Sequence, residues 1–206
     1  MNKSLLAKNN LVALILAGGK SSRMGEDKAL IPWHNIPMLK RVYQVANKCT
    51  EKVYIITPWP EKYQSMLPTE CEWLTELKTE GPLVAFAQGL AQINSNWILL
   101  LGCDLPLLNS YIIQTWVTQL NQISPEILAL VPQKYQRWEP LCGFYRQEIK
   151  IELEKIIDRG KNSFQKLLYQ IPVQPLSIDS ETEKMLFNCN TPLELEMEKK
   201  GIIESG

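Results

Sequence analysis

Residues 11–30 read LVALILAGGKSSRMGEDKAL, an uninterrupted apolar run followed at once by a loop rich in glycine, serine and charge. A short, wholly apolar run is typical of a strand buried on both faces of a sheet. Glycines directly after such a strand let backbone N–H groups approach a ligand and converge on it, an arrangement that suits an anion. This stretch therefore predicts a buried strand with an anion-binding loop behind it.

The rest of the chain alternates strand-like and helix-like segments. Further strands are expected at residues 53–57, 71–75, 97–101, 127–131, 141–145, 173–176 and 185–187. Helices are expected at residues 37–48, 61–67, 81–93, 111–120, 148–157, 163–169 and 191–199. This alternation predicts an α/β fold with a mostly parallel, mixed sheet and helices on both faces. Ligands bind beyond the carboxyl ends of the strands in such sheets, so a ligand site is expected at the loops after residues 16 and 101.

Length and charge narrow the class of protein. The chain has 206 residues with no internal repeat or flexible linker, so we expect one domain over residues 1–206 with a loose segment at residues 1–10. Lys plus Arg and Asp plus Glu each number 22, and this balance argues against nucleic acid as a partner. The apolar run from Leu11 to Ala17 is too short to span a membrane and is poorly shaped as a signal peptide. We therefore expect a cytoplasmic protein without a membrane partner.

Cysteine and histidine usage excludes several chemistries. The five cysteines lie far apart without a C-x-x-C pair, which predicts core thiols in a reducing cytosol rather than disulfides or a zinc cluster. His34 is the single histidine, and the turn-like stretch Pro32-Trp33-His34-Asn35 predicts a solvated loop residue. Catalysis through a Ser-His-Asp or Cys-His arrangement is therefore disfavoured.

Two loops carry the candidate chemistry. The first holds Lys20, Arg23 and Lys28 behind its glycines, with a spacing that matches neither a Walker loop nor G-x-G-x-x-G. The second places Asp104 at the end of a buried strand, where a carboxylate can hold magnesium against phosphate. Each loop also has a structural interpretation: a glycine turn with solvated charges, and an aspartate that caps a helix or turn. The pairing of both loops at one sheet edge favours the functional interpretation.

The first loop also carries a resemblance. LAGGKSSRMGEDKAL closely resembles the signature L-A-G-G-x-S-x-R-M-G-x-D-K of the molybdenum cofactor guanylyltransferases and their nucleotidyltransferase relatives. Further matches follow in the family's order at residues 81–83, 103–106, 139–141 and 187–194. The resemblance covers residues 11–198 and implies a Rossmann-like nucleotidyltransferase fold. It also implies that GTP and molybdenum-bound molybdopterin react to give the guanine dinucleotide cofactor and pyrophosphate.

Site residues follow from that resemblance by position. Catalytic roles fall to Arg23, Lys28 and Asp104, and Asp104 is the expected ligand of Mg²⁺. The expected GTP-binding residues are Leu16, Ala17, Gly18, Gly19, Lys28 and Asp104. Asn188 and Asn190 could bind the acceptor or form a helix-entry turn. Transient contact with cofactor-synthesis proteins or with molybdoenzyme apoproteins is also implied.

Several assignments stay open on sequence alone. The family has an acidic GTP contact shortly before Gly81, and either Glu76 or Glu80 could fill that role. The family's G-P-L-A-G is replaced here by Gly-Pro-Leu-Val-Ala at residues 81–85. Asp27 is expected to orient Lys28 or cap a turn. Cations and aromatic residues that could meet the pterin, with a solvated face or core packing as the simpler interpretation, are Arg137, Arg146, Arg159, Lys161, Trp138 and Phe144.

Other functions also fit the two loops. A cytidylyltransferase acting on the same pterin or a sugar-phosphate nucleotidyltransferase would need a similar phosphate site, because loop spacing does not select a base. A non-catalytic nucleotide-binding protein that delivers cofactor is a third class. The presence of both Lys28 and Asp104 argues against it.

Overall fold

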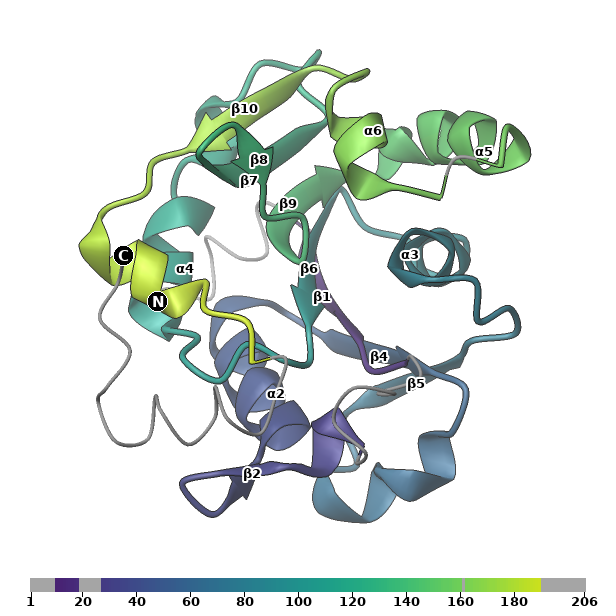
Figure 1. Ribbon diagram of the computed structural model, residues 1–206, viewed down its shortest axis with the longest axis vertical. Coiled ribbons are helices and arrows are strands. Elements are labelled where there is room, and N and C mark those ends of the chain that lie inside the picture. The colour runs from purple at the N-terminus through teal and green to yellow at the C-terminus, as the bar shows by residue number, and fades with distance from the viewer. Residues whose placement is uncertain (1–9, 19–26, 161, 190–206) are drawn as a thin grey trace.

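The computed structural model describes residues 10–18, 27–160 and 162–189, and an eight-stranded sheet runs through these ranges (Figure 1). The strands are β1 (Leu11–Leu16), β4 (Val53–Thr57), β5 (Glu72–Thr75), β6 (Trp97–Gly102), β7 (Ala129–Lys134), β8 (Arg137–Trp138), β9 (Cys142–Arg146) and β10 (Val173–Leu176). Their order is β10-β7-β9-β6-β1-β4-β5, with β8 paired to β7. This is the mixed, mostly parallel α/β sheet that the sequence predicts.

Strand direction decides where a ligand can bind. The strands β1, β4, β5 and β6 run parallel, with Leu16 opposite both Ile56 and Gly102 and with Thr57 opposite Thr75. Their carboxyl ends therefore meet at one edge of the sheet. Strand β9 runs antiparallel to both β6 and β7, so its amino end reaches the same edge.

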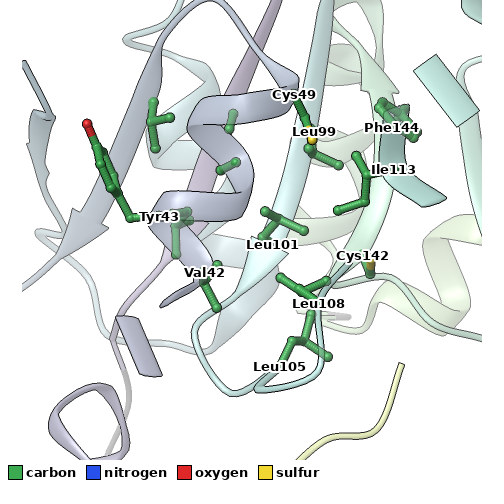
Figure 2. Close-up of a cluster of buried hydrophobic side chains, with 14 of the residues drawn as sticks. Val42, Tyr43, Cys49, Leu99, Leu101, Leu105, Leu108, Ile113, Cys142 and Phe144 are labelled. Atoms are coloured by element: carbon green, nitrogen blue, oxygen red, sulfur yellow. The ribbon is translucent and has the colours of Figure 1, made fainter. Parts of the chain in front are cut away.

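Helices cover both faces of the sheet, as expected (Figure 1). They are α2 (Met38–Cys49), α3 (Pro82–Leu90), α4 (Ser110–Val117), α5 (Lys150–Asp158), α6 (Phe164–Leu168) and α7 (Ser180–Met185). The helices α2 and α4 pack on one face, and α3, α5 and α6 pack on the other. Alternate side chains of the central strands supply both cores. Leu99 and Leu101 belong to the core on the side of α2 and α4 (Figure 2). Ile98 and Leu100 belong to the core on the side of α3.

Shorter elements complete the described structure. The strands β2 (Pro32–Trp33) and β3 (Ile36–Pro37) form a hairpin whose turn is His34-Asn35. Single 3₁₀ turns are η1 (Lys28–Leu30), η2 (Pro60–Lys62), η3 (Gln64–Met66), η4 (Leu120–Gln122) and η5 (Gln147–Ile149). His34 is exposed at this turn, as predicted. Within the described ranges, no helix is long and apolar enough to cross a membrane.

The prediction of a strand at residues 185–187 is wrong. Residues 185–187 were expected to be extended, but Met185 is the last residue of α7. The side chain of Asp179 caps this helix by accepting a hydrogen bond of 2.8 Å from the backbone N–H of Thr182. The cap satisfies a helix amide that would otherwise be unpaired, so it stabilises the helical conformation. The expected helix at residues 191–199 and the loose segment at residues 1–9 lie outside the described residues.

Candidate active site

A cavity of about 520 Å³ opens at the carboxyl ends of β1, β4, β5 and β6. Its lining is Leu16, Ala17, Gly18, Asp27, Lys28, Ala29, Trp59, Tyr63, Glu76, Thr79, Gly81, Pro82, Ala85, Gly102, Cys103, Asp104 and Leu141. The volume lies within the range that ligand pockets for small molecules occupy. Both loops singled out from the sequence therefore contribute to one cavity.

Lys28 and Asp104 meet in this cavity although 76 residues separate them in the chain. The Nζ atom of Lys28 lies 3.4 Å from Oδ2 of Asp104, and both side chains keep about a fifth of their surface exposed. A cation and a carboxylate side by side offer one group for phosphate oxygens and another for a cation bound to them. This is the arrangement expected for triphosphate chemistry.

Asp27 organises the backbone around Lys28. Its Oδ1 accepts a hydrogen bond of 3.2 Å from the N–H of Ala29, so Asp27 caps η1, one of the two roles considered from sequence. Its Oδ2 accepts a hydrogen bond of 2.7 Å from the hydroxyl of Tyr63, which is almost fully buried. Burial and the neighbouring carboxylate both raise the pKa of Tyr63, so the phenol stays protonated and remains a donor.

The carboxyl group of Glu76 packs against Gly18 at the wall of the cavity. The backbone N–H of Glu76 donates to the carbonyl of Thr57 at 3.0 Å, which fixes the residue just after β5. A Cβ atom on Gly18 would overlap Oε2 of Glu76 and would lie 3.3 Å from Cδ of Pro58. Glu76 is only 6% exposed, and its Oε2 has no hydrogen-bond partner among the described residues. Burial raises the pKa of this carboxyl.

Glu76 and Glu80 differ in their position relative to the cavity. Glu76 lines the cavity, whereas Glu80 is exposed and does not belong to the lining. Ala85, which departs from the family's glycine, also lines the cavity as a buried small side chain. Gly81, at the start of α3, has φ of +103°, a conformation that favours glycine.

A second cavity of about 100 Å³ lies beside the first. Its lining is Leu105, Glu139, Pro140, Leu141, Cys142, Leu186 and Asn188. Leu141 belongs to both linings, and the backbone N–H of Cys189 donates to the carbonyl of Asp104 at 3.1 Å. Asn188 is thereby held next to the main site.

Some of the expected site residues line the cavity, and others lie outside the described residues. Those that the structure brings together are Leu16, Ala17, Gly18, Lys28 and Asp104. Gly19, Arg23 and Asn190 lie outside the described residues, as do Lys20 and Lys161. Sequence reasoning missed Tyr63, because residues 61–67 have no signal beyond a short helical pattern.

Three of the six candidates for pterin contact have structural roles. Arg146 pairs with Trp97 at the opposite edge of the sheet, where its Nε donates to the carbonyl of Ile127 at 2.9 Å. Phe144 is fully buried and Trp138 is 7% exposed, so both belong to the core. Arg159 lies at the exposed end of α5. Arg137, on β8, is exposed at the same edge as the cavities.

The carboxylate oxygens that line the main cavity suit a hard divalent cation. The described residues contain no cluster of three or more His, Cys, Asp or Glu side chains that could enclose a metal. Magnesium needs no such cage, because one or two carboxylates with phosphate oxygens and water complete its shell. Asp104 in a cavity open to a triphosphate therefore fits magnesium.

Comparison with known proteins agrees with this geometry. The chain matches the family described as "MobA-like NTP transferase domain" over residues 13–174. A Trichormus variabilis protein named "Probable molybdenum cofactor guanylyltransferase" is 48% identical over 91% of this chain and 89% of that protein. The protein of the same name from Synechococcus elongatus is 41% identical over 89% and 95% of the two chains.

A solved structure shares the fold. It is titled "Molybdopterin-guanine dinucleotide biosynthesis protein A" from Archaeoglobus fulgidus and has a TM-score of 0.76 at 19% identity. The match covers 91% of this chain and 96% of that one. The family match and the identity to these relatives define a nucleotidyltransferase. Within that class, the chain belongs to the molybdenum cofactor guanylyltransferase family, and the resemblance seen at residues 16–30 is confirmed.

Proposed function

We propose that this protein transfers GMP from GTP to the terminal phosphate of molybdenum-bound molybdopterin. The products are the guanine dinucleotide cofactor and pyrophosphate. The observation that carries the proposal is the convergence of Gly18, Glu76, Lys28 and Asp104 on one cavity in a member of this family. These residues supply groups for the base and for the phosphates of one nucleotide.

The reaction needs alignment more than covalent help. An oxygen of the acceptor phosphate forms a bond to the α-phosphorus of GTP, while the bond from that phosphorus to the bridging oxygen breaks and pyrophosphate leaves. The acceptor phosphate is already ionised near neutral pH, so no general base is required. Lys28 stabilises the negative charge of the triphosphate, and the backbone at Gly18 lets the nucleotide approach closely.

The phosphate site as proposed extends beyond these groups. Gly19 adds a backbone amide to the cradle, and Arg23 adds a second cation to the catalytic set. The support for both is the family signature at residues 16–28. Asp104 would hold Mg²⁺ together with phosphate oxygens, and the bound ion would neutralise charge on the triphosphate.

The carboxylate of Glu76 would select guanine over the other bases. Guanine presents an N–H group and an amino group side by side, and an ionised carboxylate can accept both. Adenine presents no such pair of adjacent donors. The buried oxygen of Glu76, which has no partner among the described residues, supports GTP over the other triphosphates.

The acceptor would lie on the side of Asp104 that leads to the second cavity. Asn188 lines that cavity, and we propose that it binds the acceptor together with Asn190. Transfer of the product to a molybdoenzyme apoprotein, or receipt of the acceptor from a cofactor-synthesis protein, would require transient contact near this edge. The five cysteines are thiols, which suits a reducing cytoplasm.

One experiment separates this function from its alternatives. Purified protein is incubated anaerobically with magnesium, molybdenum-bound molybdopterin and each of the four triphosphates, and dinucleotide and pyrophosphate are measured. We expect product with GTP and little with CTP, UTP or ATP. Preference for CTP would indicate a cytidylyltransferase. Tight GTP binding without product would indicate a delivery protein.

A further inference from the structure

We propose that Glu139 is the residue that recognises the pterin ring of the acceptor, by accepting hydrogen bonds from its ring N–H and its exocyclic amino group. The inference rests on the proposed function and assigns the acceptor side of the same site. The carboxylates that line the two adjoining cavities are Asp27, Glu76, Asp104 and Glu139.

Two of these carboxylates already have partners. Asp27 accepts hydrogen bonds from Tyr63 and from the backbone of Ala29. Asp104 is paired with Lys28. Glu76 is committed to the nucleotide side because it faces Gly18. Glu139 is the carboxylate that remains for a ligand on the other side.

Glu139 is held in a position suited to that role. Its backbone N–H donates to the carbonyl of Pro132 at 2.9 Å, so the residue is fixed where β8 leads toward β9. Its side chain is half-buried and forms no hydrogen bond within the described ranges. Burial raises the pKa of this carboxyl, while Arg137 and Lys134 act in the opposite direction and favour the ionised form. A partly desolvated carboxylate is stabilised by accepting hydrogen bonds from N–H donors.

The second cavity adjoins the reaction centre. A methyl group on Gly102 would lie 2.8 Å from Oδ1 of Asp104 and 3.4 Å from Cβ of Leu141. Leu141 thus stands between Asp104 and the cavity that Glu139 lines. The apolar walls of this second cavity also include Leu105, Pro140, Cys142 and Leu186, which suit the faces of a flat heterocycle. A ligand held there can direct its phosphate toward Asp104.

The chemistry of the ligand matches this lining. A pterin carries a 2-amino-4-oxo pattern, so its amino group and the adjacent ring N–H form the same donor pair that guanine presents. A carboxylate accepts both donors at once, and a site built this way rejects analogues that lack them. The two halves of the dinucleotide would therefore be recognised by the same interaction, through Glu76 for guanine and Glu139 for the pterin.

The first test uses the unmodified protein. Anaerobic equilibrium dialysis measures how well two competitors displace molybdopterin: a 2-amino-4-oxopteridine phosphate and the matching 2,4-dioxopteridine phosphate, which has an oxygen in place of the amino group. We expect the amino compound to compete at least tenfold better. Equal competition by the two compounds would overturn the inference without recourse to a variant.

The second test uses Glu139→Gln, with Glu154→Gln on the exposed side of α5 as the matched control. In Glu139→Gln we expect molybdopterin affinity to fall on the order of tenfold to a hundredfold, as when a hydrogen bond to a charged group is lost. The preference for the amino competitor should disappear, while GTP affinity stays at the wild-type value. Unchanged molybdopterin affinity, or an equal loss of GTP affinity, would contradict the assignment. Failure of wild-type protein to make dinucleotide would instead count against the proposed function.

Discussion

The hydroxyl of Tyr63 donates a 2.7 Å hydrogen bond to the carboxylate of Asp27, the residue directly before Lys28. Tyr63 is nearly fully buried and stacks on Trp73, with ring centroids 6.5 Å apart, so its position is set by the core. Asp27 in turn caps the turn that holds Lys28. The phenol therefore links the core to the orientation of the phosphate-binding cation.

Tyr63→Phe should lower kcat/KM for GTP about tenfold, because it removes one hydrogen bond to a charged group and keeps the ring. If Tyr63 acts through Lys28, the same change should have almost no effect in a Lys28→Ala background. Steady-state kinetics of the four proteins give this cycle. A full tenfold loss in the Lys28→Ala background would contradict the link. Tyr43→Phe is the control, since Tyr43 belongs to the same core cluster but points its hydroxyl away from it (Figure 2).

Glu76→Gln should stabilise the protein in the absence of ligand. The folded-state pKa of Glu76 is raised by burial, so the folded chain binds more protons than the unfolded chain. The carboxylate therefore destabilises the fold above its folded-state pKa, and that penalty disappears below the unfolded-state pKa. Thermal unfolding at pH 7.5 should show a higher melting temperature for the variant than for the wild-type protein. At pH below the ordinary glutamate value, the gain should vanish. A gain of equal size at both pH values would contradict a charge effect.

The same carboxylate should make GTP affinity depend on pH. Two donors of guanine need the ionised form, so acidification through the raised pKa of Glu76 should weaken GTP binding. Calorimetric titration from pH 8 to pH 5 measures this, with ATP as the reference nucleotide. In Glu76→Gln, GTP and ATP affinities should approach each other and lose the difference in pH dependence. Persistent preference for GTP in that variant would remove Glu76 from base recognition.

Gly18→Ala should abolish most GTP binding while the protein stays folded. The added methyl group would overlap Oε2 of Glu76, and Pro58 limits the room on the other side. Displacement of Glu76 by the methyl group removes the proposed base contact. Calorimetry with GTP and circular dichroism on the same sample measure both effects. Wild-type GTP affinity in a folded Gly18→Ala protein would contradict the proposed cavity geometry.

Asp104→Asn should retain the fold and lose activity by about a hundredfold or more. The amide is almost the same size as the carboxylate, but it lacks the negative charge that magnesium prefers. The dependence of GTP binding on magnesium should also weaken, which a titration with and without the ion measures. Asp158→Asn, at the exposed end of α5, is the control for a simple change of charge. Wild-type turnover and magnesium dependence in a folded Asp104→Asn protein would require another metal ligand.

Local pattern was sufficient for most elements. The apolar run of β1 and the helical spacing of apolar residues in α2 give their boundaries to within about a residue, because burial on two faces or on one stripe dictates each pattern. The same pattern failed at residues 185–187, where a capping hydrogen bond from Asp179 decides for helix. A short apolar run fits either element, so it could not carry that prediction.

Sequence alone determined the sheet, the two loops at its carboxyl edge and the family, because these depend on hydrophobic period and on residues close together in the chain. Tertiary structure decided which side chains share a cavity. Glu76 and Glu80 are equivalent in sequence, yet only Glu76 faces Gly18, because its backbone is tied to Thr57 at the end of β4. Arg146 and Arg137 are equally basic, yet the antiparallel direction of β9 carries Arg146 to the far edge of the sheet. Such choices depend on strand direction and on contacts between distant residues, which local sequence does not encode.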